Sequence, residues 1–338
     1  MANGMVLVTG AAGFIGSHVV RELLEQGHTV RATVRNLENA EFLKGLPGAS
    51  KLEIVEMDLL SPDSITGAVK GCDDVIHCAA ALYVGVDDAQ TQVVDPSILG
   101  TQNLLDSIDS VGGIKRIVHT SSVAAVRRTH FNSGRVFTYE DWCDDASVDS
   151  NAYGFAKAGA EMLARGWVAS KAEDVKPRYV SINPCVVFGP VMSERHLNGS
   201  MTIVDHLLKR KYPFLVKMNV NIVDVRDVAK AHVKALTLGP DGGRYIVFNE
   251  SLWMKDIASI LRKKIPERKW PKILLPKLLT YVLSVFHPQL SFAWVKKNIG
   301  TTCSYNVEPV TKDLDMSWTP VEDSVLDGAK SAIDAGWR

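Results

Sequence analysis

Residues 5–16 decide the fold and read Met-Val-Leu-Val-Thr-Gly-Ala-Ala-Gly-Phe-Ile-Gly. The run 5–8 is short, apolar and continuous, which is typical of a strand buried on both faces of a parallel sheet. A helical pattern over 14–26 follows, and Gly27 stands where such a helix would end. A second strand is expected over 29–34, so the whole unit has the length of a parallel crossover.

The alternation of strand and helix continues to about residue 183. Further strands are expected over 52–56, 74–79, 117–120 and 178–182, with helical segments between them. Repeated alternation of this kind predicts an α/β fold with a doubly wound parallel sheet, a Rossmann-type dinucleotide-binding domain.

The pattern changes after Asn183. Loops rich in proline and glycine come first, then a strand and a helix, and the tail from Trp253 is mostly helical with scattered prolines. We therefore expect the dinucleotide-binding domain over 1–183 with a return segment over 220–238. A smaller, mostly helical substrate-binding lobe is expected over 184–219 and 239–338, at the carboxyl edge of the sheet.

Composition excludes several classes of protein. The 338 residues are 46% hydrophobic and 22% charged, which excludes disordered and collagen-like chains. The 38 basic and 38 acidic residues cancel, which argues against nucleic acid as a partner and permits a monomer or a homodimer. The five cysteines include no Cys-x-x-Cys pair, so we expect neither a metal site nor disulfides. Free thiols favour a cytoplasmic location.

No segment of the sequence predicts a membrane span or a signal peptide. The apolar run at 5–8 is too short for a signal peptide, and Pro276 and Lys277 interrupt the most apolar later stretch. The segment 270–286 is rich in apolar residues and leaves two alternatives open. It packs the small lobe, which we favour, or it contacts a membrane surface.

The glycines of the opening stretch have the spacing of a phosphate-binding loop. Gly10 permits a tight turn, Gly13 lets the backbone approach a pyrophosphate, and Gly16 lets the helix pack closely on the sheet. Phe14 and Ile15 open the helix, whose N-terminal N–H groups favour phosphate. A glycine string alone is weak evidence, but its place between strand and helix favours a dinucleotide.

The end of the second strand indicates which dinucleotide binds. An acidic residue there accepts hydrogen bonds from the ribose of NAD, whereas this chain has Arg35, which suits the 2′-phosphate of NADP(H). Further cofactor contacts are expected after the third and fourth strands, at Asp58, Leu59, Ala79, Ala80 and Ala81.

A serine, a tyrosine and a lysine complete a candidate catalytic set. Tyr153 and Lys157 are four apart, so they share one face of a helix, and the lysine cation is expected to lower the phenol pKa. Thr120 ends a strand at the ligand-binding edge, and Ser121 or Ser122 follows it. We favour Ser122 as the hydroxyl that hydrogen-bonds a substrate carbonyl, because it begins the turn away from the strand.

These motifs, together with Asn-Pro-Cys-Val-Val-Phe-Gly-Pro at 183–190, resemble the extended short-chain dehydrogenase/reductases. The segments 30–35 and 223–228 are most similar to the dihydroflavonol reductase and cinnamoyl-CoA reductase branch. The resemblance implies that Ser122 polarises a carbonyl, that Tyr153 is the acid/base and that Lys157 holds the ribose. It also implies cofactor contacts at Thr120, Pro184, Val186 and Val187.

The sequence therefore predicts an NADPH-dependent oxidoreductase that reduces a ketone or aldehyde of a hydrophobic small molecule. A 3β-hydroxysteroid or sterol dehydrogenase and an NADPH-binding sensor without catalysis are the alternatives. Apolar substrate contacts are expected at Tyr83, Phe131, Phe188 and Met192. The cationic stretch 127–130 is either an anion-binding group or a solvated loop, and we favour the loop.

Overall fold

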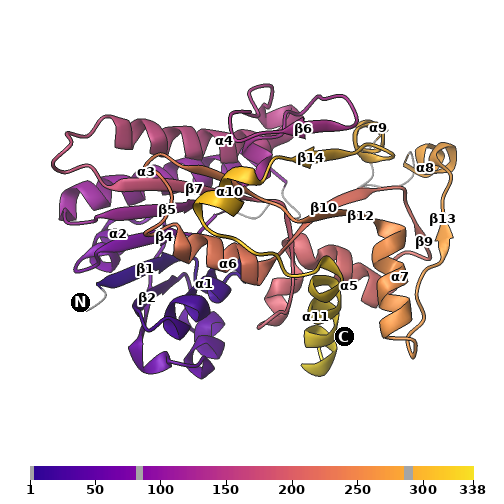
Figure 1. Cartoon of the computed structure of the whole chain (residues 1–338), viewed down its shortest axis with the longest axis horizontal. Helices are drawn as coiled ribbons and strands as arrows, with labels where there is room; N and C mark the ends of the chain where they lie inside the picture. The colour runs from indigo at the N-terminus through magenta and orange to yellow at the C-terminus, as the bar shows by residue number, and fades with distance from the viewer. Residues whose placement is uncertain (1–3, 81–86, 285–291) are drawn as a thin grey trace.

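A seven-stranded parallel sheet forms the centre of the larger part of the molecule (Figure 1). The computed structural model describes residues 4–80, 87–284 and 292–338. The strand order is β11-β7-β5-β4-β1-β2-β3, which confirms the predicted doubly wound fold. The strands are β1 (Met5–Thr9), β2 (Thr29–Val34), β3 (Leu52–Glu56), β4 (Asp74–His77), β5 (Arg116–Thr120), β7 (Arg178–Pro184) and β11 (Arg244–Val247).

Helices cover both faces of this sheet. Helices α1 (Phe14–Glu25) and α6 (Val225–Lys234) pack together on one face, and α2 (Pro62–Val69), α3 (Asp95–Val111) and α4 (Val148–Ala169) line the other. Within β1, Val6 and Val8 join the cluster on the α1 face, while Leu7 joins the cluster on the α3 face. Because successive side chains point to opposite faces, a continuous apolar run was needed here.

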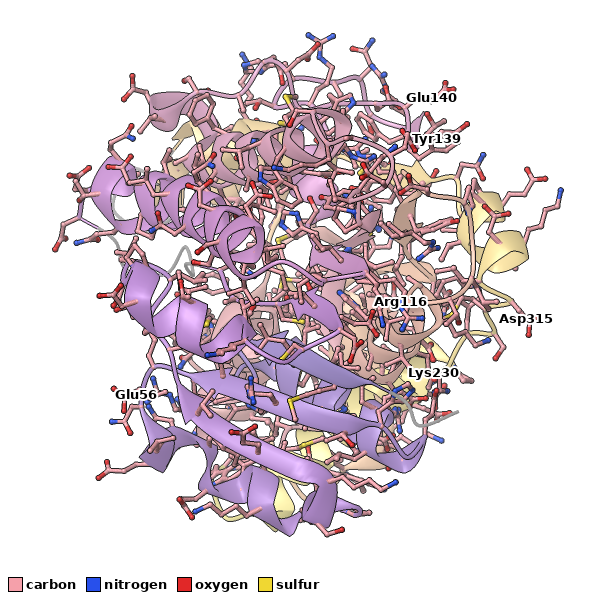
Figure 2. All side chains as sticks on the ribbon, turned by 90° about the vertical axis from the view of Figure 1, so that its left-hand side faces the viewer. Glu56, Arg116, Tyr139, Glu140, Lys230 and Asp315 are labelled. Carbon is pink, nitrogen blue, oxygen red and sulfur yellow. The ribbon has the colours of Figure 1, made fainter. Side chains whose placement is uncertain are left out.

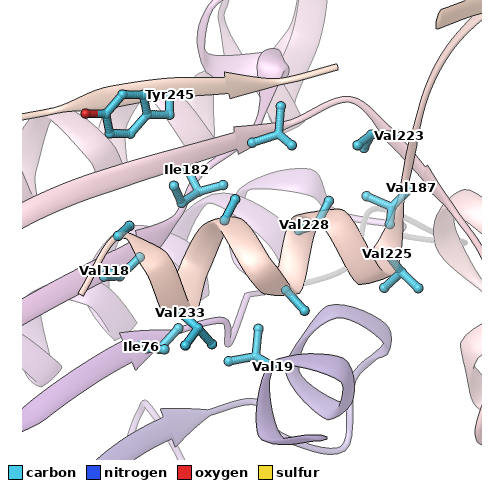
Figure 3. Close-up of a cluster of buried hydrophobic side chains, with 14 of the residues drawn as sticks. Val19, Ile76, Val118, Ile182, Val187, Val223, Val225, Val228, Val233 and Tyr245 are labelled. Atoms are coloured by element: carbon cyan, nitrogen blue, oxygen red, sulfur yellow. The ribbon is translucent and has the colours of Figure 1, made fainter. Parts of the chain in front are cut away.

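Helix α6 fills the face of the sheet beside α1. Figure 3 shows Val228 and Val233 of this helix among Ile182 and Ile76 of the sheet and Val19 of α1. All five side chains are buried. This packing fixes α6 to the large sheet.

The second part of the molecule is built around a small sheet and its own apolar cluster. Strand β10 pairs in parallel with β8 and antiparallel with β12. Helices α5, α7 and α11 contribute side chains to the cluster. These elements are β8 (Val186–Phe188), β10 (Asn219–Asp224), β12 (Glu250–Trp253), α5 (Thr202–Leu208), α7 (Met254–Lys264) and α11 (Val321–Asp334). The other elements are β6 (Arg135–Phe137), β9 (Phe214–Leu215), β13 (Ile273–Leu274), β14 (Cys303–Tyr305), α8 (Lys277–Ser284), α9 (Phe292–Asn298) and α10 (Glu308–Asp313).

The chain returns to the large sheet differently from the prediction. The predicted return segment was 220–238, but its strand, β10, belongs to the small sheet, and only α6 packs on the large one. The returning strand is β11, which pairs with β7 and lies within the range assigned to the small lobe. The division into two domains at these boundaries stays a prediction.

The apolar segment 270–286 is only partly packed. Trp270 and Leu275 are buried, whereas Ile273 is 67% exposed and Leu278 is 78% exposed. In the described ranges we find no helix with the length and apolar character of a membrane span. Contact of this segment with a membrane surface stays a prediction.

Candidate active site

The glycine loop lies at the carboxyl end of β1, where backbone must pass close to backbone. Gly10 has φ +65°, and a Cβ there would lie 2.7 Å from the Cα of Ala79. Ala79 N–H donates to the Thr9 hydroxyl oxygen at 3.1 Å, and this hydroxyl also hydrogen-bonds to His77 at 2.7 Å. These bonds join the ends of β1 and β4 and hold Gly10 close to Ala79.

Helix α1 begins directly after the loop and suits a phosphate. Gly13 is its N-cap, and the first turn contains no acidic side chain. The N–H groups of Phe14, Ile15 and Gly16 have no partner within the helix, because the first turn of any helix lacks them. They are donors for an anion, so the loop fits a dinucleotide pyrophosphate.

A histidine far along the chain supports this loop, and the sequence did not reveal it. His196 hydrogen-bonds to the Ala12 carbonyl oxygen at 3.1 Å, and its ring lies 5.6 Å from that of Phe14. Burial lowers the pKa of His196 to about 4, so the ring is neutral at pH 7. It braces the loop without adding charge.

Arg35 follows the last residue of β2 and is exposed. No carboxylate of the described residues lies within 4.0 Å of it, and the undescribed stretches 1–3, 81–86 and 285–291 contain no Asp or Glu. Its charge is therefore free to meet a 2′-phosphate.

The other predicted cofactor contacts surround the same edge. Asp58 is exposed, and its carboxylate accepts from Leu60 N–H at 2.9 Å. The Leu59 carbonyl accepts from Asn103 at 2.9 Å. Ala80 is exposed beside Ala79, whereas Ala81 lies outside the described residues.

Helix α4 carries Tyr153 and Lys157. Asn151 interrupts this helix just before the turn that bears Tyr153. Asn151 has non-helical backbone angles, and its side-chain oxygen accepts from Gly154 N–H at 3.2 Å. Its side-chain amide donates to the Thr129 hydroxyl at 3.1 Å, which ties the bend to the loop after β5. The helical turn that bears Tyr153 is therefore held at a fixed place.

Ser122, Tyr153 and Lys157 come together at the end of β5. The Tyr153 hydroxyl hydrogen-bonds to Ser122, and the Lys157 ammonium donates to the Thr120 carbonyl at 3.2 Å. Ser121 is instead buried and donates to Glu161 at 2.7 Å. Of the two serines that the sequence left open, Ser122 is the one beside Tyr153.

The titration of this group differs from the prediction. Burial raises the pKa of Tyr153 above its usual value, and the hydrogen bond from Ser122 opposes this only in part. Burial also lowers the pKa of Lys157 to about 8. The pKa of Tyr153 is therefore raised rather than lowered, and Lys157 is not among the groups that shift it.

A buried carboxylate behind this group was not predicted. Glu161 lies one turn beyond Lys157 and is fully buried; it accepts hydrogen bonds from the following side chains: Ser121, Arg165, Ser181, Asn183 and Arg244. The Arg244 cation holds the pKa of Glu161 down to about 2, against the opposing effect of burial. No sequence signal links residues so far apart.

Arg244 connects this network to the loop after β6. Its guanidinium donates to the carbonyls of Tyr139 and Asp141 at 2.6 and 2.5 Å, and lies 3.7 Å from the Trp142 ring centroid. Tyr139 and Glu140 of this loop lie at the periphery in Figure 2. The network therefore runs from α4 to the surface loop.

The remaining predicted cofactor contacts lie near the end of β7. The Asn183 side-chain amide donates to the Ser122 carbonyl at 3.2 Å, which places Pro184 beside the turn that begins at Ser122. Val186 is half-buried and Val187 is buried, both in β8. The Thr120 hydroxyl is 2.8 Å from His232 Nε2.

The predicted substrate contacts are scattered. Phe131 is half-buried and packs edge-on against Phe137, with ring centroids 5.4 Å apart, and Met192 is half-buried. Phe188 is fully buried in the apolar cluster of the second part. This corrects the prediction, because a side chain enclosed by core packing does not face a ligand. Tyr83 lies outside the described residues.

Comparison with known proteins agrees with this geometry. Residues 6–249 match the NAD dependent epimerase/dehydratase family. The chain belongs to this family. Cinnamoyl-CoA reductase CAD2 of Medicago truncatula is 33% identical over 80% of this chain and 83% of its own. The maize dihydroflavonol 4-reductase is 30% identical over 80% of this chain and 77% of its own. The predicted resemblance is confirmed.

Solved structures of Gre2 reductases in complex with NADPH share the fold of this chain. Yeast methylglyoxal/isovaleraldehyde reductase Gre2 with NADPH superposes with a TM-score of 0.81 and 26% identity, over 99% of both chains. Gre2 of Candida albicans with NADPH gives 0.79 and 25%, over 98% of this chain and 99% of that one.

Proposed function

We propose that this protein is an NADPH-dependent reductase that converts a ketone or aldehyde of a hydrophobic small molecule to an alcohol. The observation that carries the proposal is the contact of Tyr153 with Ser122, with Lys157 one turn further along the same helix. This group lies at the sheet edge that also bears the glycine loop. The NADPH complexes of the Gre2 neighbours support the choice of cofactor.

Ser122 would orient and polarise the carbonyl oxygen. Its hydroxyl oxygen accepts from Ala124 N–H at 3.1 Å, and its proton, which is donated to Tyr153 in the free protein, would turn to the substrate oxygen. Asn183 holds the Ser122 backbone from the end of β7. A hydroxyl fixed in this way stabilises the negative charge that develops on the oxygen during reduction.

Tyr153 would supply the proton. Because burial raises its pKa, the phenol is protonated at pH 7, and a protonated acid is what reduction of a carbonyl requires. The bound NADPH would supply the hydride to the carbonyl carbon. Tyr153 then gives its proton to the oxygen, and the product is the alcohol.

The cofactor would be held by this chain's own donors and cations. The N-terminus of α1 meets the pyrophosphate, Arg35 meets the 2′-phosphate, and Lys157 reaches the ribose hydroxyls. A cytoplasmic location and a monomeric or homodimeric state stay predictions.

A substrate panel tests the reductase proposal against its alternatives. Purified protein is mixed with NADPH and, in turn, aldehydes, β-keto esters, flavanones and steroid ketones, and the loss of NADPH absorbance is followed. Turnover with aldehydes or ketones supports the proposal. Activity only with a sterol and NAD⁺ would favour the 3β-hydroxysteroid or sterol dehydrogenase. NADPH binding without turnover of any compound would favour the sensor.

A further inference from the structure

Two adjacent arginines follow the catalytic serine and have opposite surroundings. Arg128 forms ion pairs with Asp144 at 3.1 Å and Asp145 at 3.8 Å. Arg127 has no carboxylate within 4.0 Å among the described residues, and the undescribed stretches contain no Asp or Glu. Of these two arginines, only Arg127 therefore has no ion pair with an acidic side chain.

The Arg127 guanidinium turns inward rather than into solvent. It donates a hydrogen bond to the Cys303 thiol, faces Tyr305 and Cys185, and lies 5.6 Å from the centroid of the Phe131 ring. Burial raises the pKa of Tyr305 and of Cys185 well above their usual values, so both are neutral at pH 7. A cation held among uncharged groups is costly unless a ligand neutralises it.

A second cation lies close to Arg127. Lys297 of α9 is half-buried, and its pKa is lowered first by burial and then by the Arg127 charge. The nearby acid, Asp145, is already engaged: it accepts from Thr129 N–H at 2.6 Å and His130 N–H at 2.9 Å, beside Arg128. Lys297 therefore adds positive potential at Arg127, and Asp145 offsets part of the charge of Lys297.

Arg127 lies close in the chain to Ser122, the residue proposed to bind the substrate carbonyl. Ser122 caps the short helix over Val123–Ala125, and Arg127 N–H donates to the Val123 carbonyl at 2.7 Å. The backbone of Arg127 thus belongs to the turn that Ser122 begins. It also faces Cys185, which comes directly after Pro184 at the end of β7.

We propose that Arg127 binds a carboxylate on the carbonyl substrate, so that the preferred substrates are hydrophobic keto acids or aldehyde acids. Phe131 contacts the apolar body of such a molecule, Ser122 and Tyr153 take its carbonyl oxygen, and Lys297 adds to the attraction. The inference rests on the proposed reductase function and names its substrate class. It replaces the solvated loop favoured from the sequence for Arg127, while Arg128 remains a surface residue paired with Asp144.

Matched pairs of substrates test this inference. The probes are 4-carboxybenzaldehyde with methyl 4-formylbenzoate, and 2-oxo-4-phenylbutanoate with its ethyl ester. The acid-to-ester ratio of kcat/KM is measured for the wild type, Arg127→Gln, Arg127→Lys and the control Arg128→Gln. Comparing ratios between variants removes the intrinsic reactivity of each compound.

We expect Arg127→Gln to lower this ratio about 10- to 100-fold, as loss of a charged hydrogen bond should. Arg127→Lys should keep part of the preference, and Arg128→Gln should keep all of it. Measurable ester turnover by Arg127→Gln, whatever its absolute rate, shows that this variant is folded. If it is inactive, the ratio for Arg127→Lys decides, and a value unchanged from the wild type contradicts the inference.

An unchanged ratio in Arg127→Gln, or an equal loss in Arg128→Gln, would overturn the inference and leave the reductase function standing. Absence of turnover of all four probes and of the wider panel would instead overturn the proposed function. Ligand binding can also be measured separately from turnover, by thermal stability. The hydroxy acid 2-hydroxy-4-phenylbutanoate should raise the Tm of the wild type with NADPH, but not that of Arg127→Gln.

Discussion

The Lys157 ammonium donates a hydrogen bond to the backbone carbonyl of Thr120, 3.2 Å away, and so joins helix α4 to the end of β5. This contact gives the buried ammonium a hydrogen-bond partner. Burial lowers the pKa of Lys157 to about 8. It also places Tyr153, one turn earlier, against the Ser122 that follows Thr120 by two residues. The arrangement of the candidate active site depends on this junction of helix and strand.

Arg35 should determine the choice between NADPH and NADH. We expect Arg35→Asp to lower the preference for NADPH by one to two orders of magnitude, because about 1.5–3 kcal/mol of charged hydrogen bonding to the 2′-phosphate is lost. The measurement is the ratio of kcat/KM for the two cofactors with one aldehyde. The same ratio in the variant and the wild type would show that Arg35 does not meet the phosphate.

Gly10 should be required for both its backbone angle and its closeness to Ala79. Gly10→Ala puts a Cβ 2.7 Å from the Ala79 backbone, so we expect loss of NADPH binding by calorimetry and a lower Tm. Gly71→Ala is the control, since Gly71 has φ +81° but nothing within 4 Å of its Cβ. The control should cost only about 1–2 kcal/mol and keep NADPH affinity. Equal losses in both variants would mean that contact with Ala79 is unimportant.

Removing one partner of the buried ion pair between Glu161 and Arg244 should destabilise the fold strongly. Removing the charge in Glu161→Gln leaves Arg244 buried without its partner, and we expect a loss of about 3–5 kcal/mol in the free energy of unfolding by urea. Glu41→Gln breaks the exposed pair with Lys44 and should cost about 1 kcal/mol or less. A Glu161→Gln variant as stable as that control would contradict this account.

The same pair should make stability depend on pH in one direction. The pKa of Glu161 is lowered from 4.5 to about 2 in the folded protein, so its stabilisation is complete above pH 4.5 and is lost as the pH falls through 2. The difference in urea midpoint between the wild type and Glu161→Gln should therefore shrink from pH 6 to pH 3. A constant difference over this range would mean that Glu161 titrates normally.

The sequence predicted six of the seven strands of the large sheet and missed β11. β2 and β3 lie at their predicted residues because their patterns are local. β11 begins with Arg244, and its burial depends on Glu161, which is 83 positions earlier. Local reading cannot supply such a partner.

The candidate site divides in the same way. The glycine loop, Ser122, Tyr153 and Lys157 were visible because each has a fixed spacing beside a strand or on a helix. Thr9 with His77, and Ala12 with His196, are contacts between distant segments and have no such spacing. Phe188 was misread because an aromatic residue after a strand looks the same whether it faces a ligand or the core.

The role of Tyr153 is the central claim, and one variant tests it most directly. Tyr153→Phe removes the hydroxyl that hydrogen-bonds to Ser122 and keeps the ring. NADPH affinity and single-substrate turnover are measured on the same preparation, with the best compound of the panel. We predict unchanged NADPH affinity and a kcat lower by about 100-fold or more, as expected for loss of a general acid. Turnover equal to that of the wild type would contradict the assignment of Tyr153 as the proton donor.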